Sequence, residues 1–89
     1  MDTHQLAKLG ILAHDFFTSG LGRFVTERAI QQIEEAQAKL LDVNPADIAA
    51  VTQLQQAARV PRQAIEWLQR AMMDGELAQQ QLAEDSEYE

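Results

Sequence analysis

The feature that most constrains this chain is a regular apolar seam that runs through its second half. The spacing between seam positions alternates between three and four residues, which is typical of a helix that packs lengthwise against another helix. The pattern holds for about five heptads, and it predicts a long helix from about residue 45 to about residue 83. The seam positions are Val51, Leu54, Ala58, Pro61, Ile65, Leu68, Met72, Gly75, Gln79 and Leu82.

Two of these positions, Pro61 and Gly75, are expected to weaken the helix. Pro61 has no backbone N–H, so it removes one helical hydrogen bond, and its ring crowds the preceding turn. Because the same phase resumes after Pro61, we expect a kink near Pro61 and not a turn that divides the helix. Gly75 is a second weak point, at which we expect the helix to fray or end.

Two shorter helices are expected before the long one. The first runs from about Thr3 to Phe17, with Asp2 or Thr3 as its N-cap. Ser19 is a plausible N-cap for the second, which is expected at about residues 20–42. The predicted core-facing positions are Leu6, Leu9, Leu12, Ala13, Phe16 and Phe17 on the first helix, and Leu21, Phe24, Val25, Ala29, Ile33, Ala36 and Leu40 on the second.

The segment from Asp42 to Asp47 carries the clearest turn signal. Asn44 is expected to cap the third helix, with Pro45 at the first helical position, where its missing N–H costs nothing. Asp47 would then place a negative charge in the first turn, which suits the helix dipole. A turn this short predicts that the second and third helices form an antiparallel hairpin.

The two arms of this hairpin are unequal. At 1.5 Å per residue the second helix is about 35 Å long and the third about 58 Å. The seam beyond Leu68 therefore needs another cover. Either the first helix lies along residues 69–83, or it folds back over the hairpin as a three-helix bundle and the distal seam faces another subunit. Both arrangements are all-α.

Composition limits the domain organisation and the partners. The chain has 89 residues, with 46% apolar and 6% aromatic residues, which predicts one helical domain over residues 1–83 with an aliphatic, alanine-rich core. Residues 84–89 are expected to form an acidic flexible tail. The net charge is −7 and there is no basic footprint, so direct nucleic-acid binding is not expected. The absence of cysteine excludes disulfides and thiolate metal sites.

The sequence has neither a signal-peptide pattern nor an apolar run close to the roughly 20 residues that span a bilayer. We therefore expect a soluble, cytoplasmic protein without membrane contact.

No constellation of residues predicts catalysis. His4 and His14 point about 80° apart on one helix, so they cannot form an i, i+4 metal pair. Glu34 and Glu35 lack the Glu-x-x-His pattern of di-iron bundles. We expect no enzyme, no cofactor, no metal and no small-molecule substrate.

A second apolar stripe predicts a binding surface on the third helix. Val60, Ala64, Trp67 and Ala71 line up about 140° from the centre of the seam. A tryptophan buries on the order of 150–250 Å², so we favour a first helix that folds over Trp67. A partner anchor and simple exposure are the alternatives. Together with positions of the distal seam, the candidate interface comprises Val60, Ala64, Trp67, Ala71, Met72 and Leu82.

The chain also resembles a group of known proteins over about residues 16–83. The segments that carry the resemblance are Ser19-Gly20-Leu21-Gly22-Arg23-Phe24, Asp42-Val43-Asn44-Pro45-Ala46-Asp47, Leu54-Gln55, Trp67-Leu68 and Asp74-Gly75-Glu76-Leu77-Ala78. In this order they resemble small helical proteins encoded in tailed bacteriophages and prophages. The resemblance implies a phage context, among head and packaging components, and it implies no functional residue.

Three hypotheses for function follow. The first is a non-enzymatic phage structural or assembly protein, located in the host cytoplasm or incorporated in the virion. It would act by helix-mediated association with itself or with a larger virion component. The second, motivated by size and charge, is a small acidic inhibitor or DNA mimic that binds a host nucleic-acid-binding protein. The third is an adaptor or chaperone, which the sequence does not separate from the first.

Overall fold

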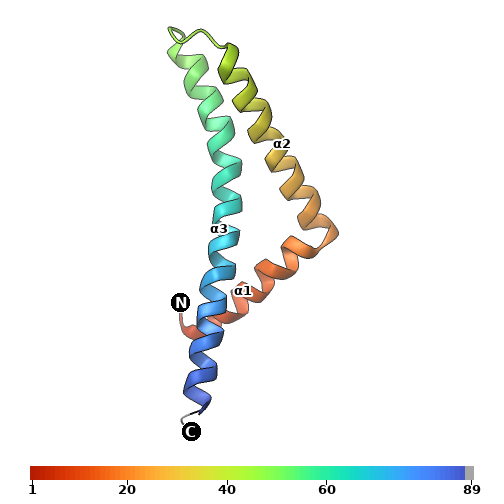
Figure 1. Cartoon of the computed structure of the whole chain (residues 1–89), viewed down its shortest axis with the longest axis vertical. Helices are drawn as coiled ribbons and strands as arrows, with labels where there is room; N and C mark the ends of the chain where they lie inside the picture. Colours follow the sequence, from red (N-terminus) through yellow and green to blue (C-terminus); the bar gives the residue numbers. More distant parts are fainter. Residues whose placement is uncertain (88–89) are drawn as a thin grey trace. The chain divides into compact units, whose positions relative to one another are not determined.

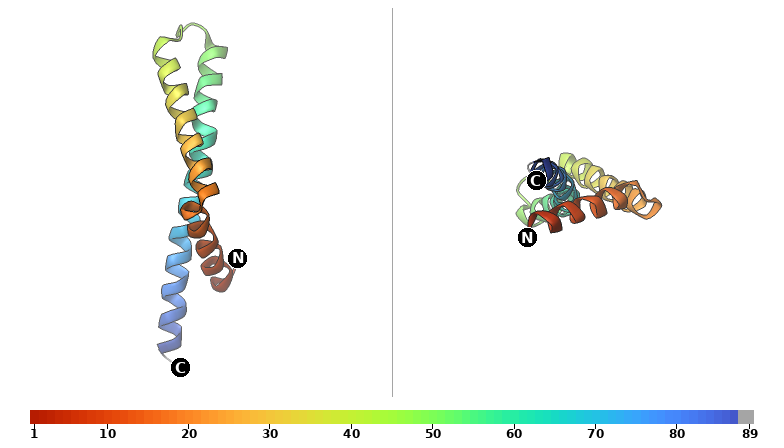
Figure 2. Two further views of the ribbon diagram at one scale, coloured as in Figure 1. Left: turned by 90° about the vertical axis from the view of Figure 1, so that its right-hand side faces the viewer. Right: turned by 90° about the horizontal axis from the view of Figure 1, so that it is seen from below.

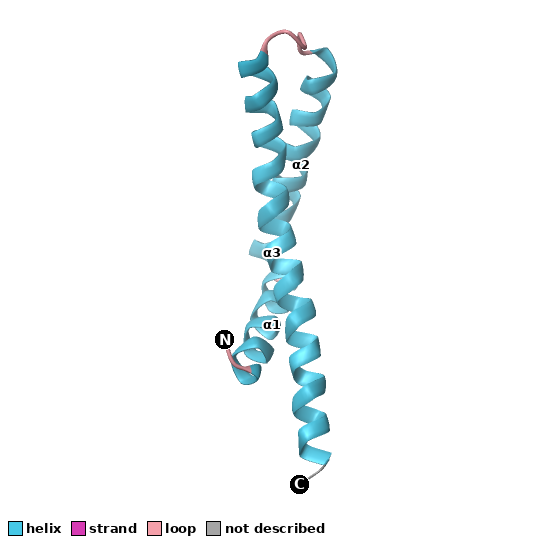
Figure 3. Cartoon of the chain, turned by 90° about the vertical axis from the view of Figure 1, so that its left-hand side faces the viewer, coloured by secondary structure: helices cyan, strands magenta, loops and turns pink. Residues whose placement is uncertain are grey.

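The computed structural model describes residues 1–87 of the chain. Its helices are α1 (Thr3–Thr18), α2 (Gly20–Asp42) and α3 (Ile48–Glu87) (Figures 1 and 3). No strand occurs between residues 1 and 87. The all-α prediction with three helices is confirmed, and the predicted bounds of α1 and α2 agree with the observed ones to within one residue.

The helices group into two compact units. The first joins Met1–Arg23 with Trp67–Glu89, and the second is Phe24–Glu66. α3 contributes to both, because the division falls within this helix. The prediction of one domain over residues 1–83 stays a prediction.

The start of α1 follows from local chemistry. The Asp2 carboxylate accepts a hydrogen bond from the Gln5 backbone N–H (2.8 Å), and Gln5 Oε1 accepts one from the Asp2 backbone N–H (3.1 Å). This reciprocal pair is a capping box, which satisfies N–H groups that have no partner within the helix. The predicted start of α1 at about Thr3 is therefore confirmed, and of the two predicted N-caps, Asp2 and Thr3, Asp2 is the one observed.

Ser19 ends α1 and starts α2. Its backbone N–H donates to the Asp15 and Phe16 carbonyls at 3.0 and 3.1 Å. Its hydroxyl donates to the Phe16 carbonyl (2.7 Å) and accepts from the Gly22 N–H (2.9 Å), as an N-cap does. A Cβ at Gly22 would overlap the Phe16 carbonyl, so only glycine fits this junction.

The turn between α2 and α3 differs from the prediction. Asn44 Oδ1 accepts from the Ala46 N–H (3.0 Å), and the Asn44 carbonyl accepts from the Asp47 N–H (2.9 Å). Pro45 is therefore the second residue of a β-turn, a position that suits its fixed φ. Asp47 is the actual cap, since its carboxylate accepts from the Ala50 N–H (3.1 Å). The prediction of an Asn44 cap and a helix start at Pro45 is wrong, because Asn44 caps only the turn.

The second unit is the predicted antiparallel hairpin (Figures 1 and 2). Ala36 and Ala58 are buried in it. The half-buried positions of the predicted stripes in this unit are Ala29, Ile33, Leu40, Val51, Leu54, Pro61 and Ile65. Phe24 is 67% exposed, so its predicted place in the core is wrong. Phe24 precedes Ile33 by nine residues, which turns it about 180° away from the packed face of α2.

Pro61 does not divide α3, which continues through it as one helix. In an α-helix, the backbone N–H of residue 61 would donate to the carbonyl of Ala57, four residues earlier. Because Pro61 has no N–H, this carbonyl lacks its helical hydrogen bond. The Gln32 side-chain amide of α2 donates to this carbonyl at 3.3 Å. Gln32, on the other arm of the hairpin, thus donates the hydrogen bond that Pro61 cannot donate. The kink near Pro61 stays a prediction.

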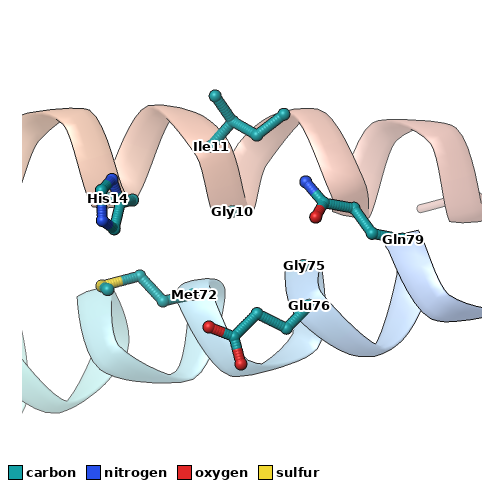
Figure 4. A pocket seen from close by; sticks show the side chains of 7 residues that line it. All are labelled: Gly10, Ile11, His14, Met72, Gly75, Glu76 and Gln79. Carbon is teal, nitrogen blue, oxygen red and sulfur yellow. The ribbon is translucent and has the colours of Figure 1, made fainter.

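The first unit packs α1 against the second half of α3. Gly10 and Gly75 face each other there (Figure 4). A Cβ added at Gly75 would lie 2.5 Å from Gly10 Cα, and one added at Gly10 would lie 2.6 Å from Gly75 Cα. Such a close approach of two backbones is possible only without side chains. The expectation that α3 frays or ends at Gly75 is wrong, because this glycine is a buried packing position within the helix.

The close approach also decides which face of α1 is covered. Ala7, Gly10 and Ala13 are buried, whereas Leu9 is 39% and Leu12 is 56% exposed. The predicted core positions Leu9 and Leu12 are therefore wrong. Small residues occupy the contact because larger side chains would hold the two backbones apart. Of the two placements considered for the first helix, the one along the distal part of α3 is the one observed.

α3 also extends beyond the predicted end of the domain. It includes residues 84–87, which were expected to belong to the tail, so the predicted loss of helical structure from residue 84 is wrong for these residues. The Ser86 hydroxyl donates to the Leu82 carbonyl at 3.0 Å, and alanine and glutamate favour helix here. Residues 88 and 89 lie outside the described part of the chain, and the mobility of the tail stays a prediction.

Candidate association surface

The core of the described chain is made of very small residues. The buried apolar side chains are all alanines: Ala7, Ala13, Ala36, Ala58 and Ala78. No large side chain in the described residues is fully buried. Many large apolar side chains are instead exposed, among them Leu41 at 87% and Trp67 at 69%. Much of the apolar area of this chain is therefore left for water or for a partner.

One part of this exposed area lies on α1. Leu9 and Leu12 line an open, mainly apolar cleft together with Met1, Gln5 and Lys8. At 100° per residue, Leu12 points about 160° away from Gly10, which faces α3. α1 is therefore apolar both on the face that α3 covers and on the opposite face.

The residues of the predicted interface fall into two groups. Val60 and Ala64, in the second unit, and Trp67, in the first, are each exposed. The favoured expectation that the first helix covers Trp67 is wrong. The contact with α1 is centred on Gly75, which lies about 80° around α3 from Trp67, and two closely approached helices cover only a narrow strip.

The other three predicted residues are half-buried within the first unit. The Ala71 carbonyl would lie 3.1 Å from a Cβ at Gly10, so Ala71 belongs to the α1–α3 contact. Met72 lines a cleft beside the same contact, and Leu82 is half-buried further along α3. For Ala71 and Met72 the predicted role at an intermolecular surface is therefore corrected to an intramolecular one.

The cleft beside the glycine contact is lined by titratable side chains of two helices, His14 of α1 and Glu76 of α3. It has a volume of about 160 Å³ and is lined by Gly10, Ile11, His14, Met72, Gly75, Glu76 and Gln79 (Figure 4). His14 Nδ1 lies 3.8 Å from the carboxylate of its neighbour Asp15, and both side chains are mostly exposed. No oriented nucleophile and base pair is present in this cleft, so it offers no evident catalytic arrangement.

Within residues 1–87, no group of three or more His, Cys, Asp or Glu side chains is placed to hold a metal ion. Over the same residues, no helix combines the length and the apolar character that crossing a membrane requires.

Comparison of the chain with protein-family models, with curated proteins and with solved structures finds no match.

The outward face of α1 is the part of this surface that sequence reasoning missed. Hydrophobic periodicity alone assigns Leu9 and Leu12 to the core, because they are the larger residues. A signal was nevertheless present. Ala7, Gly10 and Ala13 recur at spacings of three, and Ala71, Gly75 and Ala78 at four and three. Two such sets of small residues on different helices are suited to close backbone approach.

Proposed function

We propose that this chain acts without catalysis, by helix-mediated association with itself or with a larger component of a phage particle. The observation that supports the proposal most is the alanine-only core, set against many exposed large apolar side chains. Large exposed apolar patches in soluble proteins mark sites of interaction. Association would remove this area from water, at roughly 25 cal/mol per Å² of apolar surface.

The phage context of the proposal is supported by the sequence resemblance alone. Under this proposal, the protein is located in the cytoplasm of the host cell during assembly, or in the finished virion.

Sedimentation velocity of the full chain over a wide concentration range tests the proposal, together with mass spectrometry of purified particles. We expect either self-association or a stable complex with a larger particle protein. A chain that stays monomeric at every concentration and is absent from purified particles would overturn the proposal.

A further inference from the structure

We infer that the outward face of α1 pairs with the same face of a second copy of this chain, with the two α1 helices antiparallel. The inference rests on the proposed function, association, and names one partner and one surface for it. The face consists of Met1, Gln5, Leu9, Leu12 and Phe16, and we call it the α1 outer face.

The spacing of the α1 outer face is the first argument. From Gln5 onward the steps are four, three and four residues, the alternation of a helix–helix seam. This sequence of steps reads the same in both directions about the midpoint between Leu9 and Leu12. Antiparallel pairing therefore places Leu9 of each copy against Leu12 of the other. Gln5 of each copy then lies against Phe16 of the other.

This self-complementarity is what a two-fold symmetric dimer requires, because such an interface uses one surface patch twice. The exposure of the central pair agrees with this arrangement. Leu12 is 56% and Leu9 is 39% exposed, and both line the open cleft on this side of α1.

Charge at the edge of the α1 outer face is the second argument, and it selects the orientation. Lys8 and Asp15 both lie about 140–160° around α1 from Gly10, beside the outer face. The opposite edge is occupied by Leu6 and Ala13, which are half-buried and buried against the rest of the first unit. Only one edge of the face is therefore free to carry charges.

Antiparallel pairing brings Lys8 of each copy near Asp15 of the other, which gives two opposite-charge pairs by symmetry. Parallel two-fold pairing would instead place the charged edge of each copy beside the Leu6 and Ala13 edge of the other, where neither charge meets an opposite one. Opposite charges that face each other across an interface fix its register. The charge pattern thus favours a second copy in the antiparallel orientation.

The size of the surface predicts a weak dimer. A face of four positions on one helix, with Met1 just before that helix, falls in the class of interfaces that bury less than about 1,200 Å² in total, which is typical of transient complexes. The association is therefore expected to depend strongly on protein concentration.

Sedimentation equilibrium of the full chain, with circular dichroism as a check on helix content, tests this inference. Leu12→Glu would place a charge at the centre of the apolar contact, so we expect the dimer dissociation constant to rise at least about tenfold. Leu41→Glu is the matched control. Leu41 is 87% exposed and lies outside the α1 outer face, so this variant should dimerise like the wild type.

Charge exchange tests the orientation. Lys8→Glu alone should weaken the dimer, and Lys8→Glu combined with Asp15→Lys should restore it to within about twofold. If the double variant is no stronger than Lys8→Glu alone, the antiparallel register is wrong. Equal association of wild type and Leu12→Glu would overturn the α1 surface altogether.

The outcomes also separate this inference from the proposed function. If the wild type associates and Trp67→Glu, but not Leu12→Glu, abolishes the association, the α1 dimer is wrong and the proposed function stands. A wild type that is monomeric at all concentrations overturns the α1 dimer. The proposed function then depends only on whether the chain is present in purified particles.

Discussion

At the scale of single residues, the glycines of this chain lie in three different environments. Gly10 and Gly75 allow two helices to touch through their backbones, and Gly22 makes room for the Phe16 carbonyl. Gly20 meets nothing within 4 Å of an added Cβ. The sequence shows only that these residues are glycines. Which of them are required depends on neighbours that are distant along the chain.

Gly75→Ala provides a test of the backbone contact. Alanine favours an isolated helix by about 1 kcal/mol over glycine. In the folded chain, however, its Cβ would lie 2.5 Å from Gly10 Cα and 3.1 Å from the Leu6 carbonyl oxygen, which are backbone atoms. We therefore expect the free energy of unfolding to fall by about 1–3 kcal/mol, the usual cost of overpacking.

Urea unfolding followed by circular dichroism measures this change. Gly20→Ala is the control, because nothing opposes its Cβ, and it should leave the free energy of unfolding unchanged or slightly raised. A Gly75→Ala variant as stable as Gly20→Ala would contradict the close contact between α1 and α3.

The cap of α3 is a second test at residue scale. Asp47 accepts the Ala50 N–H as a helix cap, whereas Asn44 accepts the Ala46 N–H within the turn. Asp47→Ala should therefore destabilise the chain by about 1 kcal/mol through the lost cap. Thermal unfolding of Asp47→Ala and Asn44→Ala at one pH compares the two positions. A larger loss for Asn44→Ala would show that the turn, and not the cap, limits the start of α3.

At the scale of elements, local chemistry and packing were predictable to different degrees. The bounds of α1 and α2 follow from caps and breakers, which act within a few residues, so the sequence alone was enough. The start of α3 was misplaced because Asn44 and Asp47 are both good caps, and which one ends the turn depends on its hydrogen bonds. The seam of α3 was predicted well as far as Gly75, since apolar periodicity reports the packed face of an amphipathic helix directly. Beyond Gly75 the predicted position Gln79 is exposed, and its neighbour Ala78 is buried instead.

The packed face of α1 could not be found in that way. This helix has apolar residues on two faces, and periodicity does not rank one above the other. The close approach of Gly10 to Gly75 determines which face of α1 is packed, and these two residues are 65 positions apart in the sequence. The same reason explains why two of the six predicted interface residues lie at the contact within the chain. Ala71 and Met72 could be assigned only after the partner of α1 was known.

The pairing of Gln32 with Ala57 yields a prediction at element scale. Gln32→Ala removes the donor to the carbonyl that Pro61 leaves unbonded, and it should cost about 0.5–1.5 kcal/mol. In a Pro61→Ala background the backbone N–H of residue 61 can bond that carbonyl instead. The same Gln32→Ala change should then cost much less.

A double-mutant cycle of these two substitutions, measured by urea unfolding, gives the coupling energy directly. Equal costs of Gln32→Ala in both backgrounds would mean that Gln32 does not compensate for Pro61.

At the scale of the whole molecule, the single chain buries little apolar area and leaves many large apolar side chains exposed. A core of alanines gives little hydrophobic stabilisation, because each buried alanine removes only a small apolar area from water. Native proteins are stable by only about 5–15 kcal/mol in total. A chain that leaves Trp67, Leu12 and Leu41 in water therefore has much to gain from a partner.

Trp67→Ala separates stability from association at this scale. Trp67 is 69% exposed, so its truncation should change the free energy of unfolding of the monomer by less than about 0.5 kcal/mol. If Trp67 anchors a partner, the same truncation should weaken that complex by about 2 kcal/mol or more, because exposed tryptophans are frequent binding hot spots. Leu41→Ala controls for the general loss of exposed apolar area.

Unfolding at low protein concentration and co-purification with particles give the two measurements. A loss of more than about 1 kcal/mol in the monomer would show that Trp67 packs within the chain, contrary to its exposure. An unchanged monomer with a lost complex would assign Trp67 to the association surface. An unchanged monomer and an unchanged complex would exclude Trp67 as an anchor, and the α1 outer face would be the surface to test next.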